Sequence, residues 1–447
     1  MKSLKKNKVY IFFSSLLLVI LLFGCSNQQV SEGTESSQRV TNDVELKTVQ
    51  YDKPEHIKSI ELESSDYSDL EFLKDILKDK RVVMLGESSH GVSEYSLIKS
   101  RLIKFLHEEL DFNVVAFESG LAEVNSTNEM LLDISPEKAM KNTLHPVWFT
   151  DHNMYLFKYI KEQKATKNPI NIVGFDMQPQ PYIDKYINDY FKGRNTDFTA
   201  DLQAVEQEFY MFVSSIWRGN YPENWHEESE LLIEKYNDLL YQLSQGKWEE
   251  FVSEDEKQLF IKIFEQRIRS ITEKYTEENV MDQSGKGDFE SRDRIMASNL
   301  EWLLEEIYPD EKFIVWAHNA HIMKNRSNIN IDPKQYMNMV EYLPEIIKED
   351  SYIVGLYMYS GKNTYHNEGV IEVSTDHKSN SIEYHLNEPG YPVSFINIDL
   401  EDDSTNRYWW NSEATGKFWG SFEEIFIPSE QYDGLIQIEE VNPPNFR

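Results

Sequence analysis

Four short apolar runs, each followed directly or after one glycine by a polar side chain, dominate the hydrophobic pattern of the chain. They span residues 82–85, 113–117, 170–175 and 313–317, and further strand-like runs follow at 352–358 and 393–398. Amphipathic stretches lie between the runs, as in the segment that holds Tyr95, Ile98 and Leu102 at helical spacing. Strands that alternate with helices favour parallel pairing and right-handed crossovers. The pattern therefore predicts an α/β fold with a central, mostly parallel sheet flanked by helices.

The pattern changes between residues 197 and 279. No strand-like run occurs there, and long amphipathic stretches such as 231–243 take over. This predicts a helical insertion that divides the α/β domain into residues 56–196 and 280–447. The insertion is either a lid over the functional cleft or a structural subdomain with no part in substrate binding.

Six polar side chains lie directly after the predicted strands or in the turns that follow them. The ends of parallel strands meet at one edge of a sheet, and ligands bind at that edge in open α/β folds. Helix capping explains any one of these residues, but histidine and glutamate are poor N-caps, so capping does not explain the set. We therefore predict a functional cleft formed by Glu87, His90, Glu118, Asp176, His318 and His321.

His90 is the candidate general base, because a neutral imidazole can take a proton from water near pH 7. Glu87 or Glu118 would fix the tautomer of His90 and stabilise its imidazolium, as the acidic residue does in a hydrolase triad. The GESSHG motif contains Ser88 and Ser89 but is not the G-x-S-x-G elbow. A serine nucleophile is therefore disfavoured.

Two roles are open for His318 and His321. They could donate hydrogen bonds to a substrate carbonyl and its developing oxyanion. They could also bind a metal together with Glu87 or Glu118, although H-x-x-H spacing alone is a weak metal signal.

Other side chains are candidates for substrate binding. Arg292 lies in the first turn of a predicted helix, where a positive charge opposes the helix dipole, and this indicates carboxylate partners. Trp148 precedes another predicted helix, from where it could reach the cleft. The candidates for substrate binding are Arg292, Arg101, Asp176, Glu94 and Trp148.

The composition and the N-terminal residues bear on partners and location. Apolar residues make up 40% of the 447 residues, and the formal net charge of −32 disfavours nucleic acid as a partner. Four lysines precede an apolar run at 9–23 that ends in the sequence LFGC, which is similar to a lipobox. Cys25 is the only cysteine, so we expect lipidation there and no intramolecular disulfide. Residues 1–24 would be a signal peptide, and residues 25–55 a tether on the extracytoplasmic side of the cell membrane.

Four sequence blocks, in the same order, resemble those of the erythromycin esterase family. The resemblance covers roughly residues 60 to 440 and implies a mixed α/β sheet with a helical insertion. It also implies metal-independent hydrolysis of an ester, which is a macrolide lactone in named members of the family. The blocks are LGESSHGVSEYSLIKSRLIKFLHEELDFNVVAFES (85–119), IVGFDMQ (172–178), SRDRIMASNLEWLL (291–304) and VWAHNAHIMK (315–324).

The resemblance also assigns roles to individual residues. The family histidine that activates water falls on His90. The other family positions fall on Glu87, Glu118, His318, His321 and Arg292.

Three functional hypotheses follow. The first is a lipid-anchored hydrolase that opens a small-molecule carboxylic ester or lactone with no cofactor. The second is a metal-dependent hydrolase that uses the same residues. The third is an anchored lipoprotein that binds a small ligand such as haem and catalyses nothing. The sequence does not specify the substrate or the oligomeric state.

Overall fold

The computed structural model describes residues 53–179, 196–245, 253–282, 284–330, 335–364, 369–398 and 408–447. The predicted signal peptide, Cys25 and nearly all of the predicted tether lie outside these residues. In the part of the chain that is described, no helix is both long and apolar enough to span a bilayer.

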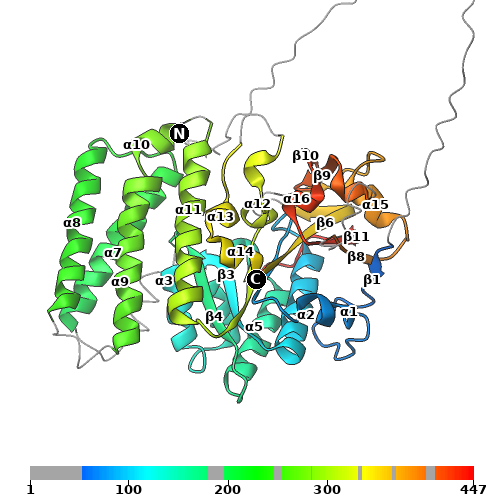
Figure 1. The fold of residues 1–447 in the computed structure, drawn as a ribbon. Coiled ribbons are helices and arrows are strands. Elements are labelled where there is room, and N and C mark those ends of the chain that lie inside the picture. Colours follow the sequence, from blue (N-terminus) through cyan, green and yellow to red (C-terminus); the bar gives the residue numbers. More distant parts are fainter. Residues whose placement is uncertain are drawn as a thin grey trace, which may run out of the picture.

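A nine-stranded sheet forms the centre of the molecule (Figure 1). The strand order is β1-β8-β11-β6-β2-β5-β3-β4, and β7 pairs with the end of β6. From β11 to β4 all neighbours are parallel, whereas β8 and β1 add antiparallel pairs at one edge. The strands are β1 (Glu55–His56), β2 (Val82–Leu85), β3 (Phe112–Gly120), β4 (Asn171–Asp176), β5 (Lys312–Trp316), β6 (Ser351–Thr364), β7 (Val370–Glu372), β8 (Val393–Asn397) and β11 (Gly434–Val441).

The four strands predicted first from the apolar runs are neighbours in this sheet, in the order β2-β5-β3-β4. Val83 pairs with Ile314, and Val115 pairs with both Ile314 and Ile172. The strands are apolar along nearly their whole length because helices bury both faces of the sheet. The predicted α/β class and the mostly parallel sheet are confirmed.

The two faces of the sheet belong to two separate hydrophobic clusters. Val83 and Leu85 point to one cluster, and Val82 and Met84 point to the other, as the two-residue period of a strand requires. The first face is covered by α1 (Phe72–Leu77), α2 (Ser93–Leu110), α4 (Pro136–Thr143) and α5 (Asp151–Lys164). The second is covered by α11 (Lys286–Trp302), α13 (Met339–Tyr342), α14 (Glu345–Glu349) and α15 (Ile382–Asn387).

Among its described residues, the segment for which a helical insertion was predicted contains four α-helices, which Figure 1 shows in green beside α11. They are α7 (Thr196–Trp217), α8 (Trp225–Ser244), α9 (Glu254–Arg269) and α10 (Glu277–Met281). Arg267 of α9 is fully buried and bonds Glu206 of α7 at 3.1 Å and the Met177 carbonyl oxygen at 3.3 Å. It also lies 3.5 Å from Glu123 of α3 (Leu121–Glu129). The insertion is therefore fastened to the chain directly after β4.

Some elements were not expected from the sequence. Strand β11 lies inside the sheet between β8 and β6, and a separate hairpin is formed by β9 (Ala414–Phe418) and β10 (Phe422–Phe426). Pro344 separates α13 from α14, because the residue before a proline avoids the helical conformation, and Leu343 has a ψ of 149°.

Candidate active site

The turn after β2 carries Glu87 and His90 and lies against the turn after β5. A Cβ atom on Gly86 would lie 2.0 Å from Asn319 Oδ1, so the close approach requires glycine. The backbone N–H of Asn319 donates to the Glu87 carbonyl oxygen at 2.9 Å. The side-chain amide of Asn319 bonds the backbone of Leu356 in β6 at 3.1 and 3.3 Å. These contacts hold the ends of β2, β5 and β6 together.

The Glu87 carboxylate is buried and contacts three polar side chains. Its Oε1 accepts hydrogen bonds from His90 Nδ1 at 2.5 Å and from Trp148 Nε1 at 3.1 Å. Its Oε2 lies 2.7 Å from the ammonium of Lys99, which is fully buried and 4.2 Å from the ring centre of Trp316. The carboxylate is thereby held in one orientation toward His90.

The His90 imidazole is surrounded by aromatic rings. Its ring centre lies 4.9 Å from Trp148, 4.9 Å from His318 and 5.3 Å from Trp419, each in an edge-to-face arrangement. Because a carboxylate only accepts hydrogen bonds, the contact with Glu87 puts a proton on Nδ1 and the lone pair of the neutral ring on Nε2. The side chain of His90 is 14% exposed, so solvent can reach it.

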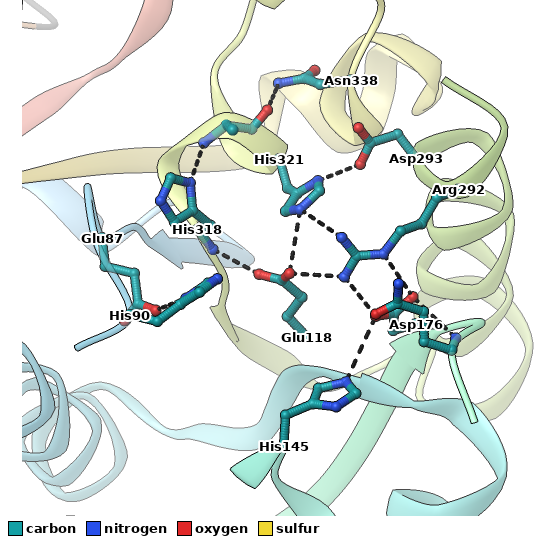
Figure 2. Close-up of polar contacts among 12 residues, drawn as sticks. Glu87, His90, Glu118, His145, Asp176, Arg292, Asp293, His318, His321 and Asn338 are labelled. Atoms are coloured by element: carbon teal, nitrogen blue, oxygen red, sulfur yellow. Dashed lines mark hydrogen bonds and ion pairs between the residues drawn. The ribbon is translucent and has the colours of Figure 1, made fainter. Parts of the chain in front are cut away.

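A buried ion cluster gathers residues from the ends of β3 and β4 and from α11 (Figure 2). Arg292 Nη2 donates to Glu118 Oε1 at 2.9 Å and to Asp176 Oδ2 at 2.6 Å. Burial opposes the ionisation of both carboxyls. His321 and Arg292 nevertheless hold the pKa of Glu118 well below its usual range, and Arg292 lowers the pKa of Asp176. Both are therefore carboxylates. Arg292 does have carboxylate partners, but the expectation that it lies in the first turn of its helix is wrong, because α11 begins at Lys286 and Arg292 lies in its second turn.

His321, which belongs to the short helix α12 (Asn319–Ile322), is part of the same cluster. Its Nδ1 donates to Asp293 at 2.5 Å, and its Nε2 lies 3.2 Å from Glu118 Oε1. Burial alone would lower the pKa of His321, but Asp293 and Glu118 raise it to about 10. His321 is thus an imidazolium at neutral pH. Its Nε2 lies 3.1 Å from Arg292 Nη1, and the carboxylates of Glu118, Asp176 and Asp293, which contact one or both cations, offset their repulsion.

His318 differs from His321 in both charge and contacts. Its backbone N–H donates to Glu118 Oε2 at 2.8 Å, and its Nδ1 accepts from the Ala320 N–H at 3.1 Å. Burial lowers the pKa of His318 well below its usual range, so the ring is neutral. The remaining proton is therefore on Nε2. That buried N–H has no hydrogen-bond partner among the described residues.

The structure does not bring Arg101 and Glu94 to this cluster, which corrects the expectation that they bind substrate. The guanidinium of Arg101 is buried and donates to Asp69 at 2.6 and 3.1 Å. On α2 it is Lys99 that faces Glu87, and helix residues two positions apart point in different directions. Glu94 instead accepts hydrogen bonds from Asn442, after β11, at 2.8 and 3.1 Å.

Three residues of the site were missed in the sequence. Asp293 contacts His321, and Lys99 contacts Glu87. Both contacts depend on which way each helix is rotated, which the sequence pattern does not specify. Trp419 comes from the β9–β10 turn, where its φ of 54° lies in the left-handed region and its N–H donates to the Ser88 carbonyl oxygen at 2.8 Å. No sequence pattern indicated that this hairpin reaches His90.

The donor atoms around the cluster bear on the metal alternative. Glu118 accepts hydrogen bonds from Arg292, from the His318 backbone N–H and from His321. Across the described residues, no group of three or more histidine, cysteine, aspartate or glutamate side chains is arranged to hold a metal ion.

Comparison with known proteins identifies the family. The family model named Erythromycin esterase matches residues 107–441, which is most of the chain. The chain belongs to the erythromycin esterase family. The resemblance seen in the sequence blocks is thereby confirmed, and membership of this family supports a hydrolase that acts on a small molecule.

Similarity to individual proteins supports the same family assignment. The Bacillus subtilis (strain 168) protein named "Putative hydrolase YbfO" is 32% identical over 407 residues, which cover 87% of this chain and 90% of that protein. Erythromycin esterase type II of Escherichia coli is 26% identical over 66% of this chain and 73% of its own length. The solved structure of a mutant erythromycin esterase, EreC, in its open conformation shares the fold, with a TM-score of 0.65 at 17% identity over 88% of this chain and 98% of that one.

Proposed function

We propose that this protein hydrolyses a carboxylic ester or lactone by means of a water molecule that His90 activates without a metal ion. The observation that carries the proposal is the 2.5 Å contact between His90 Nδ1 and the buried Glu87 carboxylate. A histidine that donates one N–H to a buried carboxylate is arranged as a general base, because the carboxylate stabilises the imidazolium that forms.

The reaction proceeds in two proton transfers. His90 Nε2 takes a proton from water while the water oxygen attacks the carbonyl carbon, and the carbonyl oxygen becomes an oxyanion. The C–O bond to the alcohol then breaks, and the His90 imidazolium returns its proton to the leaving alkoxide. Glu87 accepts the Nδ1–H throughout and remains ionised, as the acidic member of a hydrolase triad does.

His318 is the proposed oxyanion donor. Its Nε2–H has no hydrogen-bond partner within the described ranges, and the centre of its ring lies 4.9 Å from that of His90. A preorganised donor of this kind stabilises charge that appears only in the transition state. Glu118 fixes His318 through the backbone N–H, and the Arg292–His321 pair keeps Glu118 ionised.

The test uses the purified full chain incubated with macrolides and with simple carboxylic esters, and mass spectrometry detects the addition of one water. A product in any arm, absent with His90→Gln, is the expected result. Turnover that disappears with a chelator and returns with zinc or manganese would replace the proposal with the metal-dependent alternative. If no ester or lactone is cleaved, the hydrolase proposal fails.

We also propose that the protein is anchored outside the cytoplasm through a lipid on Cys25. The support is the lysine-rich start, the apolar run and the LFGC sequence, in which Cys25 is the only cysteine of the chain. Cys25→Ser should move the protein from the membrane fraction to the soluble fraction or block its processing. Equal membrane recovery of both forms would contradict the anchor.

A further inference from the structure

The tip of the β9–β10 hairpin brings aromatic side chains to the two histidines of the proposed reaction. The ring centre of Trp419 lies 5.3 Å from that of His90 and 5.4 Å from that of His318. Phe418, the residue before it, lies 5.0 Å from His318. Trp148 adds a third ring, 4.9 Å from His90. We call Trp148, Phe418 and Trp419 the aromatic wall.

The backbone of Trp419 has a conformation that is unfavourable for tryptophan. Its φ of 54° lies in the left-handed region, and Asp111 is the only other non-glycine residue of the described ranges with a positive φ. Asp111 caps α2, and aspartate enters this region more readily than a bulky residue does. In the hairpin, Trp419 and Gly420 are the central residues of a turn that the Ser421 N–H closes on the Phe418 carbonyl oxygen. Asn-Gly is the preferred pair in such a turn, so the turn gives no reason for a tryptophan.

Contacts with two other segments hold this strained turn in place. The backbone N–H of Trp419 donates to the Ser88 carbonyl oxygen at 2.8 Å, in the turn that also carries Glu87 and His90. The Trp419 carbonyl oxygen accepts from Asn363 Nδ2, on the end of β6, at 3.2 Å. Strained backbone of this kind concentrates at active sites and ligand contacts, where the surrounding structure maintains it. The strain therefore points to a function for the side chain that the turn carries.

Packing within the core does not explain the tip of the hairpin either. Trp148 is buried and its indole N–H donates to Glu87, but Phe418 and Trp419 are only partly buried. Both rings thus keep apolar surface in contact with solvent beside the reacting groups. Burial of such surface by a ligand is favourable, and aromatic rings gain further from stacked or edge-to-face contact with another ring.

The position of Trp419 decides which part of a substrate it can touch. In the proposed reaction the ester carbonyl lies between the His90 imidazole, which activates the water, and the His318 N–H, which receives the oxyanion. Trp419 is in ring contact with both of these histidines. A group bonded directly to the ester therefore lies beside the indole ring. A neutral flat ring fits this place, because it covers apolar surface and brings no charge to desolvate.

We propose that Trp419 determines substrate specificity: its indole ring contacts a flat, neutral ring attached to the ester, so that the protein selects esters that carry an aromatic ring over short aliphatic esters. This inference rests on the proposed ester hydrolysis and adds the class of substrate to it. It also gives the β9–β10 hairpin a part in substrate binding.

The test measures kcat/KM of the full chain for three esters. Methyl acetate has no ring, methyl benzoate has a ring on the acyl side, and benzyl acetate has a ring on the alcohol side. Each value is divided by the rate constant of alkaline hydrolysis, which removes differences in intrinsic reactivity. Wild type should then favour at least one ester with a ring over methyl acetate. Trp419→Asn should lower this preference about 5- to 10-fold, the effect of one lost ring contact, and Trp419→Phe should retain more of it.

Trp419→Asn should remain folded, because asparagine tolerates the left-handed conformation and keeps the N–H that bonds Ser88. If it does not fold, Trp419→Gly, which has no strain at this φ, takes its place with the same expected result. A folded variant of either kind that leaves the preference within about twofold of wild type would overturn the role of Trp419, while the hydrolase proposal would stand.

The matched control is Ile425→Thr in the same hairpin. Phe418 pairs with Phe422, so Ile425, three residues further on, lies on the opposite face of the hairpin, and it is 37% exposed. Threonine keeps the branched shape that suits a strand. This variant should leave the preference unchanged. A loss equal to that of Trp419→Asn would show that the hairpin as a whole, and not the indole ring, sets the preference.

A binding measurement separates the two proposals if none of the three esters is cleaved. That outcome contradicts ester hydrolysis for these probes but leaves the contact with Trp419 testable. Benzamide and N-benzylacetamide are amides that place the ring on the acyl side and on the other side of the carbonyl. Calorimetry should show that at least one of them binds wild type about 5- to 10-fold more tightly than it binds Trp419→Asn. Equal affinities, or no binding of either amide, would overturn the contact as well.

Discussion

Two histidines three positions apart in the chain have opposite charge states because of their immediate neighbours. His321 lies between Asp293 and Glu118 and is an imidazolium, whereas His318 has a backbone N–H on one ring nitrogen and aromatic rings around it. The same residue type therefore serves once as a structural cation and once as a neutral donor. Their difference leads to two separate predictions.

The first prediction concerns the pH dependence of stability. The pKa of His321 is about 10 in the folded protein and near 6.5 in the unfolded chain, so the folded state binds more protons between these values. The contribution of His321 to the unfolding free energy is complete below about pH 6.5 and is lost as the pH rises toward 10. Denaturant titrations at several pH values give the unfolding free energies of wild type and His321→Gln. The difference between the two should decline as the pH rises, and a difference that does not change with pH would contradict the assignment.

The second prediction concerns His318. His318→Phe keeps a ring against His90 but removes the Nε2–H, so kcat should fall roughly 10²- to 10³-fold while KM changes little. The loss of the cap on the Ala320 N–H should also lower the melting temperature modestly. A variant that keeps the wild-type kcat on a cleaved ester would exclude His318 as the oxyanion donor.

At the scale of elements, the site depends on how closely the β2 and β5 turns approach each other. Glu87 and His90 follow Gly86, and Asn319 occupies the space that a side chain at position 86 would need. The strand ends could be predicted from the apolar runs, because parallel strands align their carboxyl ends. The distance between the two turns could not be predicted, because it depends on contacts between segments that are remote in the chain.

Gly86→Ala tests this close approach. The new Cβ would collide with Asn319 Oδ1 and lie 3.0 Å from the Val354 carbonyl oxygen, so the turn must move. The unfolding free energy should fall by roughly 1–3 kcal/mol, as in other overpacked cores, and kcat should fall with it. Gly390→Ala is the control for adding a methyl group, since nothing lies within 4 Å of its Cβ and only its positive φ opposes the change. Equal activity of Gly86→Ala and wild type would contradict the role given to this turn.

The site residues that lie near strand ends could be predicted from the sequence, and those that depend on contacts between remote segments could not. His90, Glu87, Glu118, Asp176, His318 and His321 stand at strand ends or in the turns that follow them, where the pattern of the sequence is strong. Lys99 and Arg101 both lie on α2, and only the rotation of the helix decides that Lys99 reaches Glu87. Trp419 reaches His90 through a hairpin that has no distinctive sequence pattern.

At the scale of the whole molecule, Arg267 joins the helical insertion to the sheet. Its guanidinium is fully buried and connects α7 and α3 with the Met177 carbonyl oxygen, one residue after Asp176. The insertion and the ion cluster are therefore expected to unfold together. A mobile lid that swings as a unit would have to break this buried network.

Replacement of Arg267 by methionine should be strongly destabilising. It leaves Glu206 and Glu123 buried near each other without their cation, at a cost of about 3–5 kcal/mol. Arg294→Met is the matched control, because Arg294 is 45% exposed and its ion pair with Glu273 is worth at most about 1 kcal/mol. Equal effects of the two variants in thermal unfolding would show that Arg267 does not join the two parts.

The most direct test of the whole account is the kcat of His90→Gln on an ester that the wild-type chain hydrolyses. Melting temperatures are measured alongside to establish that the variant is folded. The account predicts a loss of at least about 10²-fold in kcat with a native melting profile, since the variant lacks the base that deprotonates water. A folded variant that hydrolyses the ester at the wild-type rate would contradict it.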